Sequence, residues 1–221
     1  MKGKKILKII GIILLILFVL LLVHTIRNYI IVSSLQNKIS KYANSTNYHV
    51  KITTYGTKEK NDITTMDYYK KDDKVVVIAE RNMNGEISKI STYNHDNRTD
   101  TFIEGKEEKI AQIGERKTGI VVQIYNLLEN DTRLQTFLAC VFAHIRSEQI
   151  DNKECYIVSK YYSNMGWEIE GKNERYIDKE TGLLIKNITD DTVTERSYEF
   201  DNVSDEVFIE PDIGQYTILK K

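Results

Sequence analysis

The sequence lacks the short motifs by which several classes of enzyme are recognised. It contains no glycine-rich phosphate loop, no Gly-x-Ser-x-Gly elbow, and no His-Glu-x-x-His or Gly-Lys-Ser/Thr sequence. The four histidines are scattered, and Cys140 and His144, four residues apart on a predicted helix, have no further ligands in register for a metal ion. The pattern therefore predicts a protein that is not an enzyme and that uses no metal and no cofactor.

An excess of basic charge is also absent. The chain has 31 Lys and Arg against 32 Asp and Glu. Four of the lysines lie before or at the start of a long apolar run, and 31 less these four leaves 27 basic residues elsewhere. A surface with more acidic than basic residues argues against binding to nucleic acid or to an anionic lipid surface. We therefore expect no nucleic-acid partner.

Cysteine is scarce, and both cysteines, Cys140 and Cys155, lie far beyond the apolar run. They fall in the part of the chain that we expect to be exported, where disulfides persist. They could form a bridge or remain two buried free thiols, because one lies in a helical pattern and the other in a strand-like one, and the sequence does not give their separation. No cysteine closely follows the apolar run, which argues against a lipid-modified start.

The dominant feature is the apolar run Ile6–Val23, which one lysine and one glycine interrupt. About 20 helical residues cross a bilayer, so residues 6–26 are predicted to form a transmembrane helix. Lys2, Lys4 and Lys5 precede the run, Lys8 lies near its start, and only Arg27 closely follows it. This asymmetry predicts that residues 1–5 are cytoplasmic and that the chain beyond the span is extracytoplasmic. A cleaved signal peptide is the alternative, but no Ala-x-Ala-like pattern follows the run. We therefore predict a single-pass protein of the cell membrane.

Two segments are expected after the span. Residues 27–46 have apolar residues at helical spacing, which predicts an amphipathic stalk helix. In residues 47–221, an extracytoplasmic domain, the period changes to two and strand-forming residues dominate. Short connections between the first six strands predict an antiparallel meander. The expected strands are Tyr48–Thr57, Asp62–Lys71, Lys74–Arg81, Glu86–Asn94, Asp100–Glu104, Lys106–Ile113, Glu148–Tyr162, Gly166–Glu170, Asn173–Asp178, Leu183–Asp190 and Thr192–Asp201.

Two helices are expected between the two sets of strands. The first covers residues 120–128, and the second begins after a cap at Asp131 or Thr132. The second helix has a wide apolar stripe that should lie on the sheet, either as ordinary core or as the wall of a ligand site. The candidate ligand-binding residues of this stripe are Leu134, Phe137, Leu138, Val141, Phe142 and Ile145.

Three phrases resemble the lipoprotein-carrier superfamily, whose relatives include periplasmic sigma-factor regulators. Arg175–Lys186 is similar to the superfamily's hairpin, in which a strand that ends in Asp meets a Thr-Gly turn. Tyr68–Val75 resembles its early pair of strands around a basic turn, and Tyr198–Asp212 resembles its closing stretch. The resemblance covers residues 48–219. It implies an α+β fold in which a curved antiparallel sheet, an open half-barrel, carries the inserted helical pair on its concave face.

The resemblance also implies a binding role, because members of this superfamily hold acyl chains or peptide segments on an apolar sheet face. No catalytic residues transfer from it. We therefore expect a membrane-anchored, non-catalytic extracytoplasmic protein that binds a lipid, a lipoprotein, an acyl chain or a peptide segment. The alternative is a structural or sensory subunit of a bacterial cell-envelope complex that acts through protein partners.

Overall fold

The computed structural model describes residues 2–58, 62–95, 98–114, 124, 132–161 and 173–219. The chain divides into two compact units, each built from two segments that are distant in sequence. Unit 1 combines Met1–Ser40 with Asn126–Leu184, and unit 2 combines Lys41–Tyr125 with Ile185–Lys221. Helices and mainly antiparallel strands are both present, so the predicted α+β class is confirmed. The expected strand at 166–170, and the expected helix at 120–128 apart from residue 124, lie outside the described residues.

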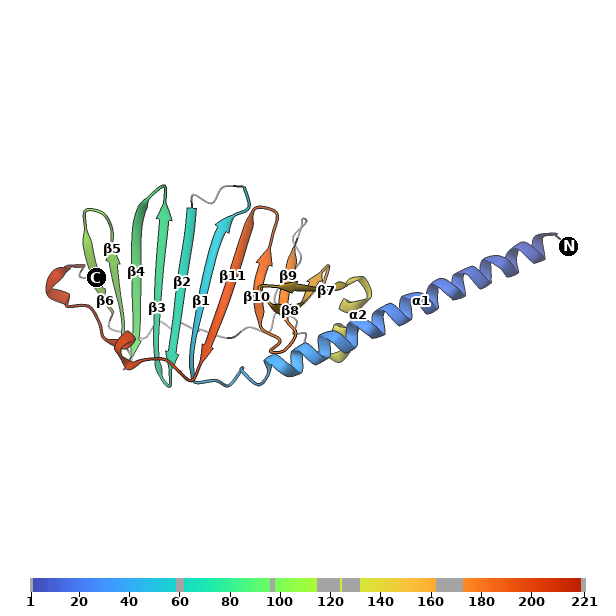
Figure 1. Ribbon diagram of the computed structural model, residues 1–221, viewed down its shortest axis with the longest axis horizontal. Helices are drawn as coiled ribbons and strands as arrows, with labels where there is room; N and C mark the ends of the chain where they lie inside the picture. Colours follow the sequence, from blue (N-terminus) through green and yellow to red (C-terminus); the bar gives the residue numbers. More distant parts are fainter. Residues whose placement is uncertain are drawn as a thin grey trace. The chain divides into compact units, whose positions relative to one another are not determined.

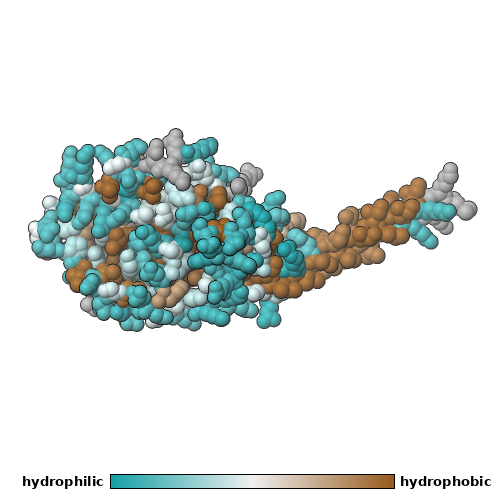
Figure 2. Space-filling view, in the orientation of Figure 1, coloured by the Kyte–Doolittle hydropathy of each residue, from teal (hydrophilic) through white to brown (hydrophobic). Residues whose placement is uncertain are grey.

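The first element of unit 1 is α1 (Lys2–Ile39), one continuous helix (Figure 1). Its N-terminal half is rich in leucine and isoleucine and contains no proline, which favours an unbroken helix. The side chains of Ile6–Val23 are exposed, and Figure 2 shows them as a hydrophobic rod. By length and composition this helix could cross a membrane or act as a signal sequence.

The second half of α1 belongs to the core of unit 1. A stripe at helical spacing is buried there, formed by Thr25, Asn28, Val32, Leu35 and Ile39. The helix ends at Ile39, and residues 40–44 form turns, so it is shorter than the helix expected to residue 46.

The second helix, α2 (Arg133–Phe142), begins with a capping box. The Thr132 hydroxyl accepts a hydrogen bond from the Gln135 backbone N–H at 3.1 Å, and the Gln135 side-chain oxygen accepts from the Thr132 backbone N–H at 2.9 Å. The helix stops at Ala143, whose backbone is extended. The chain then enters β7 at His144.

Three antiparallel strands complete unit 1, in the order β9-β8-β7: β7 (His144–Ile150), β8 (Lys153–Ser159) and β9 (Glu174–Asp178). The single strand expected at 148–162 is two strands in the structure. Asp151 and Asn152 have φ values of 46° and 65°, and consecutive left-handed residues reverse the chain into a tight hairpin. Asp and Asn tolerate this conformation better than most residues.

The core of unit 1 forms where α1, α2 and this small sheet meet. Its buried members are Val32, Leu35, Ala139, Cys140, Ala143, Ile145, Val158, Tyr161, Ile177 and Leu184. They come from every helix and strand of the unit, so the second half of α1 is part of the hydrophobic core.

Unit 2 is a sheet with strand order β12-β6-β5-β4-β3-β2-β1-β11-β10. The strands are β1 (Asn47–Gly56), β2 (Asp62–Lys71), β3 (Lys74–Met83), β4 (Glu86–His95), β5 (Arg98–Glu104), β6 (Lys109–Ile113), β10 (Leu184–Ile188), β11 (Thr192–Phe200) and β12 (Thr217–Leu219). Each of β1 to β6 pairs antiparallel with the next, so the predicted meander is confirmed. The terminal strand β12 instead pairs parallel to β6.

The C-terminal segment covers part of one face of unit 2. It contains two short 3₁₀ helices, η1 (Asp205–Phe208) and η2 (Ile213–Gln215). Phe208 and Tyr216 from this segment pack with the buried side chains of Val76, Tyr93, Phe102 and Ala111. Tyr216 and Phe102 make an edge-to-face contact with ring centroids 5.1 Å apart.

Candidate functional site

The predicted apolar stripe of α2 is divided by the structure into three environments. Leu134, Leu138 and Phe142 are exposed, by 66%, 55% and 70%. Phe137 and Val141 are half-buried. Ile145 is buried and lies on β7, not on the helix, because the extended backbone of Ala143 ends α2 before it. The stripe was expected to lie on the sheet, whereas the side chains of its outer row are exposed.

The inner face of α2 packs on α1 through small side chains, Thr136, Ala139 and Cys140, which allow a close approach of the two helices. Asn28 of α1 fixes the end of α2, because its side-chain amide donates to the carbonyl oxygens of Cys140 and Ala143 at 3.2 and 2.8 Å. These carbonyls belong to the last turn, where a helix has no internal donors left.

His24 adds a second polar contact at this helix end. Its Nε2 lies 3.1 Å from the carbonyl oxygen of Ala143 and 3.0 Å from the Asn28 amide nitrogen. No sequence pattern predicted this clamp, because a polar residue at the edge of an apolar run is typical of a membrane interface. Its role depends on partners more than a hundred residues away.

The bridge considered between Cys140 and Cys155 is absent, and both are buried free thiols. Side chains alternate along β8, and Tyr156 and Val158 pack with Cys140 on one face of the small sheet. Cys155 therefore points to the opposite face. Burial raises the pKa of the Cys140 thiol to about 12, so the reactive thiolate is scarce at neutral pH.

The strand register of unit 2 gives the sheet two chemically different faces. Tyr48, Val50, Ile52 and Thr54 of β1 share a face with the residues paired to them on β2 and β11, and the pairing continues to β6. We call this the threonine face. Its members include Thr54, Thr64, Thr92, Thr101 and Thr194 together with Val50, Ile52, Met66, Val77, Ile90 and Ile103.

The threonine face combines methyl groups and hydroxyls. Thr54 and Thr194 approach to 3.3 Å between their hydroxyl oxygens, and Thr92 and Thr101 approach to 3.4 Å. Ile90 on β4 is 43% exposed. Such a surface can contact a hydrocarbon chain and can also hydrogen-bond an ester or amide.

At the β10–β11 end of the threonine face, two buried polar atoms have no hydrogen-bond partner in the described part of the chain. They are Nη1 of Arg196 on β11 and Oδ1 of Asn187 on β10. Asn187 pairs with Thr194, which is two residues before Arg196, so both groups project from the same face of adjacent strands. A buried donor and acceptor left open are costly unless a ligand or water completes them.

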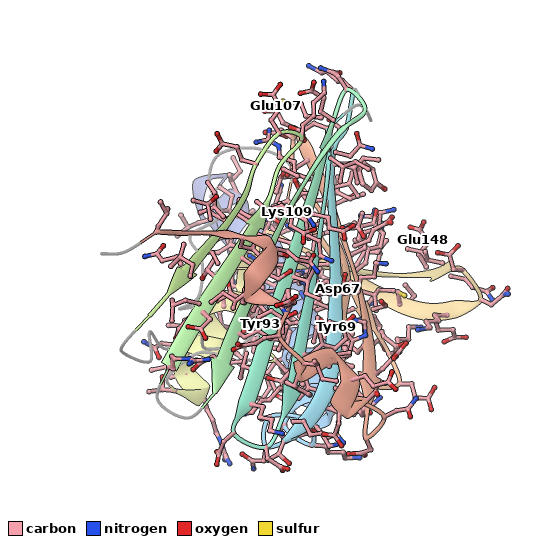
Figure 3. The ribbon with its side chains drawn as sticks, turned by 90° about the vertical axis from the view of Figure 1, so that its left-hand side faces the viewer. Asp67, Tyr69, Tyr93, Glu107, Lys109 and Glu148 are labelled. Atoms are coloured by element: carbon pink, nitrogen blue, oxygen red, sulfur yellow. The ribbon has the colours of Figure 1, made fainter. Side chains whose placement is uncertain are left out.

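The opposite face carries most of the charge and is called the charged face. His49, Asp67, Glu199 and Tyr69 meet there, with His49 Nε2 2.7 Å from Asp67 Oδ1 and Nδ1 3.6 Å from Glu199 Oε2. The His49 and Tyr69 rings stack with their centroids 4.3 Å apart. Figure 3 labels Asp67 and Tyr69 on β2, and Tyr93 of the same face on β4. Cross-strand polar contacts of this kind stabilise a sheet.

Desolvation, followed by the nearby carboxylates of Asp67 and Glu199, raises the pKa of Tyr69. A phenol with a raised pKa is a weaker acid and stays neutral. The arrangement at His49 therefore supports a structural role.

Comparison with known proteins gives no family. No family model matches the sequence, and the search of curated proteins found no match. Among solved structures, an uncharacterized conserved protein from Thermus thermophilus has a TM-score of 0.46 at 10% identity and covers 85% of this chain and 98% of its own. A DUF1329 family protein from Desulfovibrio piger has a TM-score of 0.30 at 10% identity, with coverages of 84% and 97%.

A third structure, of MucB in complex with MucA(peri), has a TM-score of 0.35 at 9% identity. The match covers 79% of this chain and 58% of the MucB chain. At these scores and identities the likenesses do not assign the chain to a family. The resemblance to lipoprotein carriers stays a prediction from the quoted phrases.

Proposed function

We propose that the chain is a single-pass membrane protein whose outward-facing part binds an acyl chain with an anionic head on the threonine face. The observation that carries the proposal is the make-up of this face, in which threonine and aliphatic side chains surround an arginine whose Nη1 has no described partner. Removing an acyl chain from water onto such a surface is favourable by about 0.8 kcal/mol per buried CH₂ group. Arg196 would pair with the head group.

The membrane anchor is supported by the continuity of α1. The apolar residues of Ile6–Val23 are exposed, and the same helix then buries Asn28, Val32 and Leu35 in the core of unit 1. The residues just past the run, where a signal peptide would be cut, are helical and bonded to α2. An uncleaved anchor agrees with both features.

A photoactivatable fatty acid tests the ligand site. Membranes that contain the full chain are incubated with a fatty acid that carries a diazirine in its acyl chain, irradiated, and digested for mass spectrometry. We expect labelling of α1, which contacts bulk lipid, and additional labelling on β3, β4 and β5 of the threonine face. Labelling of α1 alone would contradict the ligand proposal while leaving the anchor intact.

Two variants of one strand provide a matched control. Ile90 lies on the threonine face of β4 and Ile87 on its charged face, and both side chains are exposed. We expect Ile90→Glu to remove most of the labelling of unit 2 and Ile87→Glu to leave it unchanged. Equal effects of the two substitutions would contradict the assignment of the face.

The contact between Arg196 and the head group is tested by removing the charge on each side in turn. On the protein, Arg196 is replaced by Gln, and on the ligand, the fatty acid is replaced by its methyl ester. Arg196→Gln should reduce labelling by the fatty acid more than labelling by its methyl ester. Lys51→Gln should change neither, because Lys51 lies on the other face of the strand that pairs with β11. An Arg196→Gln variant that keeps its preference for the free acid would exclude this guanidinium as the head-group site.

A further inference from the structure

The outer face of α2 is an exposed apolar stripe. Leu134, Leu138 and Phe142 follow one another at intervals of four residues, so they lie on one side of the helix. The helix contains no acidic residue, and Arg133 is its only charge. A row of large apolar side chains left open to water on a short helix marks a surface that contacts something apolar.

The position of α2 along α1 indicates what that contact is. The rings of Tyr29 and Phe137 pack edge to face with their centroids 5.8 Å apart. The C-terminal end of α2 is hydrogen-bonded to the side chains of Asn28 and His24. The Phe142 end of α2 is therefore held within one turn of Val23, where the apolar run ends. Figure 1 shows α2 lying beside this part of α1.

Two residues of α1 extend the apolar surface at the same level. Ile26 is 45% exposed and Ile30 is 62% exposed, although both lie beyond the apolar run. Each helical residue rises about 1.5 Å, so Ile30 lies about 6 Å past residue 26, where the predicted span ends. A bilayer of about 40–45 Å with a hydrocarbon core of about 30 Å has interfacial layers of about 5–8 Å on each side.

We propose that α2 is an interfacial helix whose Leu134, Leu138 and Phe142 side chains insert into the outer leaflet of the membrane that holds α1. This inference rests on the membrane anchor proposed above. Leucine and phenylalanine on one side of a helix are the side chains that interfacial helices bury at the boundary between head groups and acyl chains. Ile26 and Ile30 continue this contact along α1, and unit 1 is attached to the bilayer by two helices.

Tryptophan fluorescence in brominated vesicles tests the proposal. The full chain, with Trp167→Phe as background, receives a single tryptophan as Phe142→Trp, Leu138→Trp, Ile12→Trp or Ile87→Trp. Each variant is reconstituted into phosphatidylcholine–phosphatidylglycerol vesicles whose phosphatidylcholine carries bromine near the start of its acyl chains. We expect Phe142→Trp and Leu138→Trp to lose most of their fluorescence, as Ile12→Trp in the span does, while Ile87→Trp on unit 2 keeps its intensity.

Flotation of the same vesicles after an alkaline carbonate wash separates the two proposals. A chain that does not float overturns the membrane anchor. A chain that floats, with quenching of Ile12→Trp but not of Phe142→Trp and Leu138→Trp, overturns the interfacial helix and keeps the anchor. Crosslinking between copies at Leu138 in that second case would identify another copy as the cover of α2.

Discussion

Gly182 holds the turn after β9 against the end of α1. Its φ is +77°, and a Cβ atom at this position would lie 2.6 Å from the Leu35 carbonyl oxygen and 3.1 Å from the Ile39 nitrogen. The turn is also fixed by Asp178, whose carboxylate accepts from the backbone N–H groups of Glu180 and Thr181 at 2.7 and 3.0 Å. Only glycine satisfies both the conformation and the contact.

Gly182→Ala should therefore destabilise the chain by about 2 kcal/mol or more, because the strain of a left-handed alanine adds to a backbone clash. Gly85 is a matched control, since its φ is +88° and nothing lies within 4 Å of its Cβ position. Gly85→Ala should cost about 1 kcal/mol, the strain alone. Urea unfolding of the full chain in detergent micelles measures both, and equal losses would show that the turn can move away from α1.

Asn28 is a polar residue with no exposed surface in the core of unit 1. Removing its amide leaves the Cys140 and Ala143 carbonyl oxygens without this donor. We expect Asn28→Ala to cost about 1–3 kcal/mol and to raise hydrogen exchange at the end of α2. Asn37→Ala, on the exposed side of the same helix, should stay within about 0.5 kcal/mol of the parent. Unchanged exchange in Asn28→Ala would exclude the clamp.

At the scale of the element, α2 has only ten residues and depends on its ends. Isolated helices of this length are marginal in water. Thr132→Ala removes the side-chain half of the capping box and should cost about 1 kcal/mol, whereas Thr132→Ser should keep most of the stability. Hydrogen exchange of the first turn of α2 measures the effect. Faster exchange across unit 2 as well would argue against a local cap.

The sequence predicted most of the elements of unit 2, because its strands are long and alternate regularly. Strand β2 has the expected bounds, and the Thr-Gly turn lies where the Arg175–Lys186 phrase placed it. Helical spacing of apolar residues gave a wrong prediction where one apolar segment passes from a helix into a strand. Val141, Phe142 and Ile145 fit helical spacing, but the chain becomes extended at Ala143, and no proline or glycine marks this change.

Other features of the site depend on partners that a single sequence does not identify. The Asn28 clamp joins residues more than a hundred positions apart, and the parallel pairing of β12 uses only three residues. The candidate stripe is split into exposed Leu134 and buried Ile145 because α2 ends at Ala143 and Ile145 lies on β7. The alternation of apolar and polar residues along the strands predicted a sheet with an apolar face. The pairing of threonines across that face depends on which residues of neighbouring strands lie opposite each other, and the sequence alone does not specify this register.

At the scale of the whole molecule, stability should fall in acid. The pKa values of Asp62, Glu104 and Asp205 are lowered by hydrogen bonds from Arg81, Tyr216 and Lys71 respectively. A carboxyl with a lowered folded pKa stabilises the fold above its unfolded pKa, and this stabilisation is lost as the pH falls through the folded value. Burial raises the pKa of Asp100, so its protonation acts in the opposite sense and offsets part of the loss.

Stability should also fall in alkali. Burial raises the pKa of Tyr198 and Tyr216 from 10.0 to about 12, so the stabilisation is complete below pH 10.0 and is lost as the pH rises towards 12. We expect a plateau around neutral pH in the urea midpoint of the full chain, with a decline on both sides. In Tyr216→Phe the alkaline decline should weaken, and the acid decline should weaken too, because the Glu104 bond is lost. A midpoint that changes steadily through neutral pH would contradict these assignments.

The pairing of β1 determines when the chain can finish folding. β1 lies between β2, its neighbour in sequence, and β11, which is made near the end of the chain. While the intervening residues are synthesised, one edge of β1 has no strand beside it, and the second half of α1 has no core to join. Open edges invite pairing with other chains, and non-local pairings form slowly. For most of its synthesis the growing polypeptide must therefore avoid aggregation while β11, the second partner of its first strand, and the core that receives its first helix are still missing, which makes it a natural client for a chaperone.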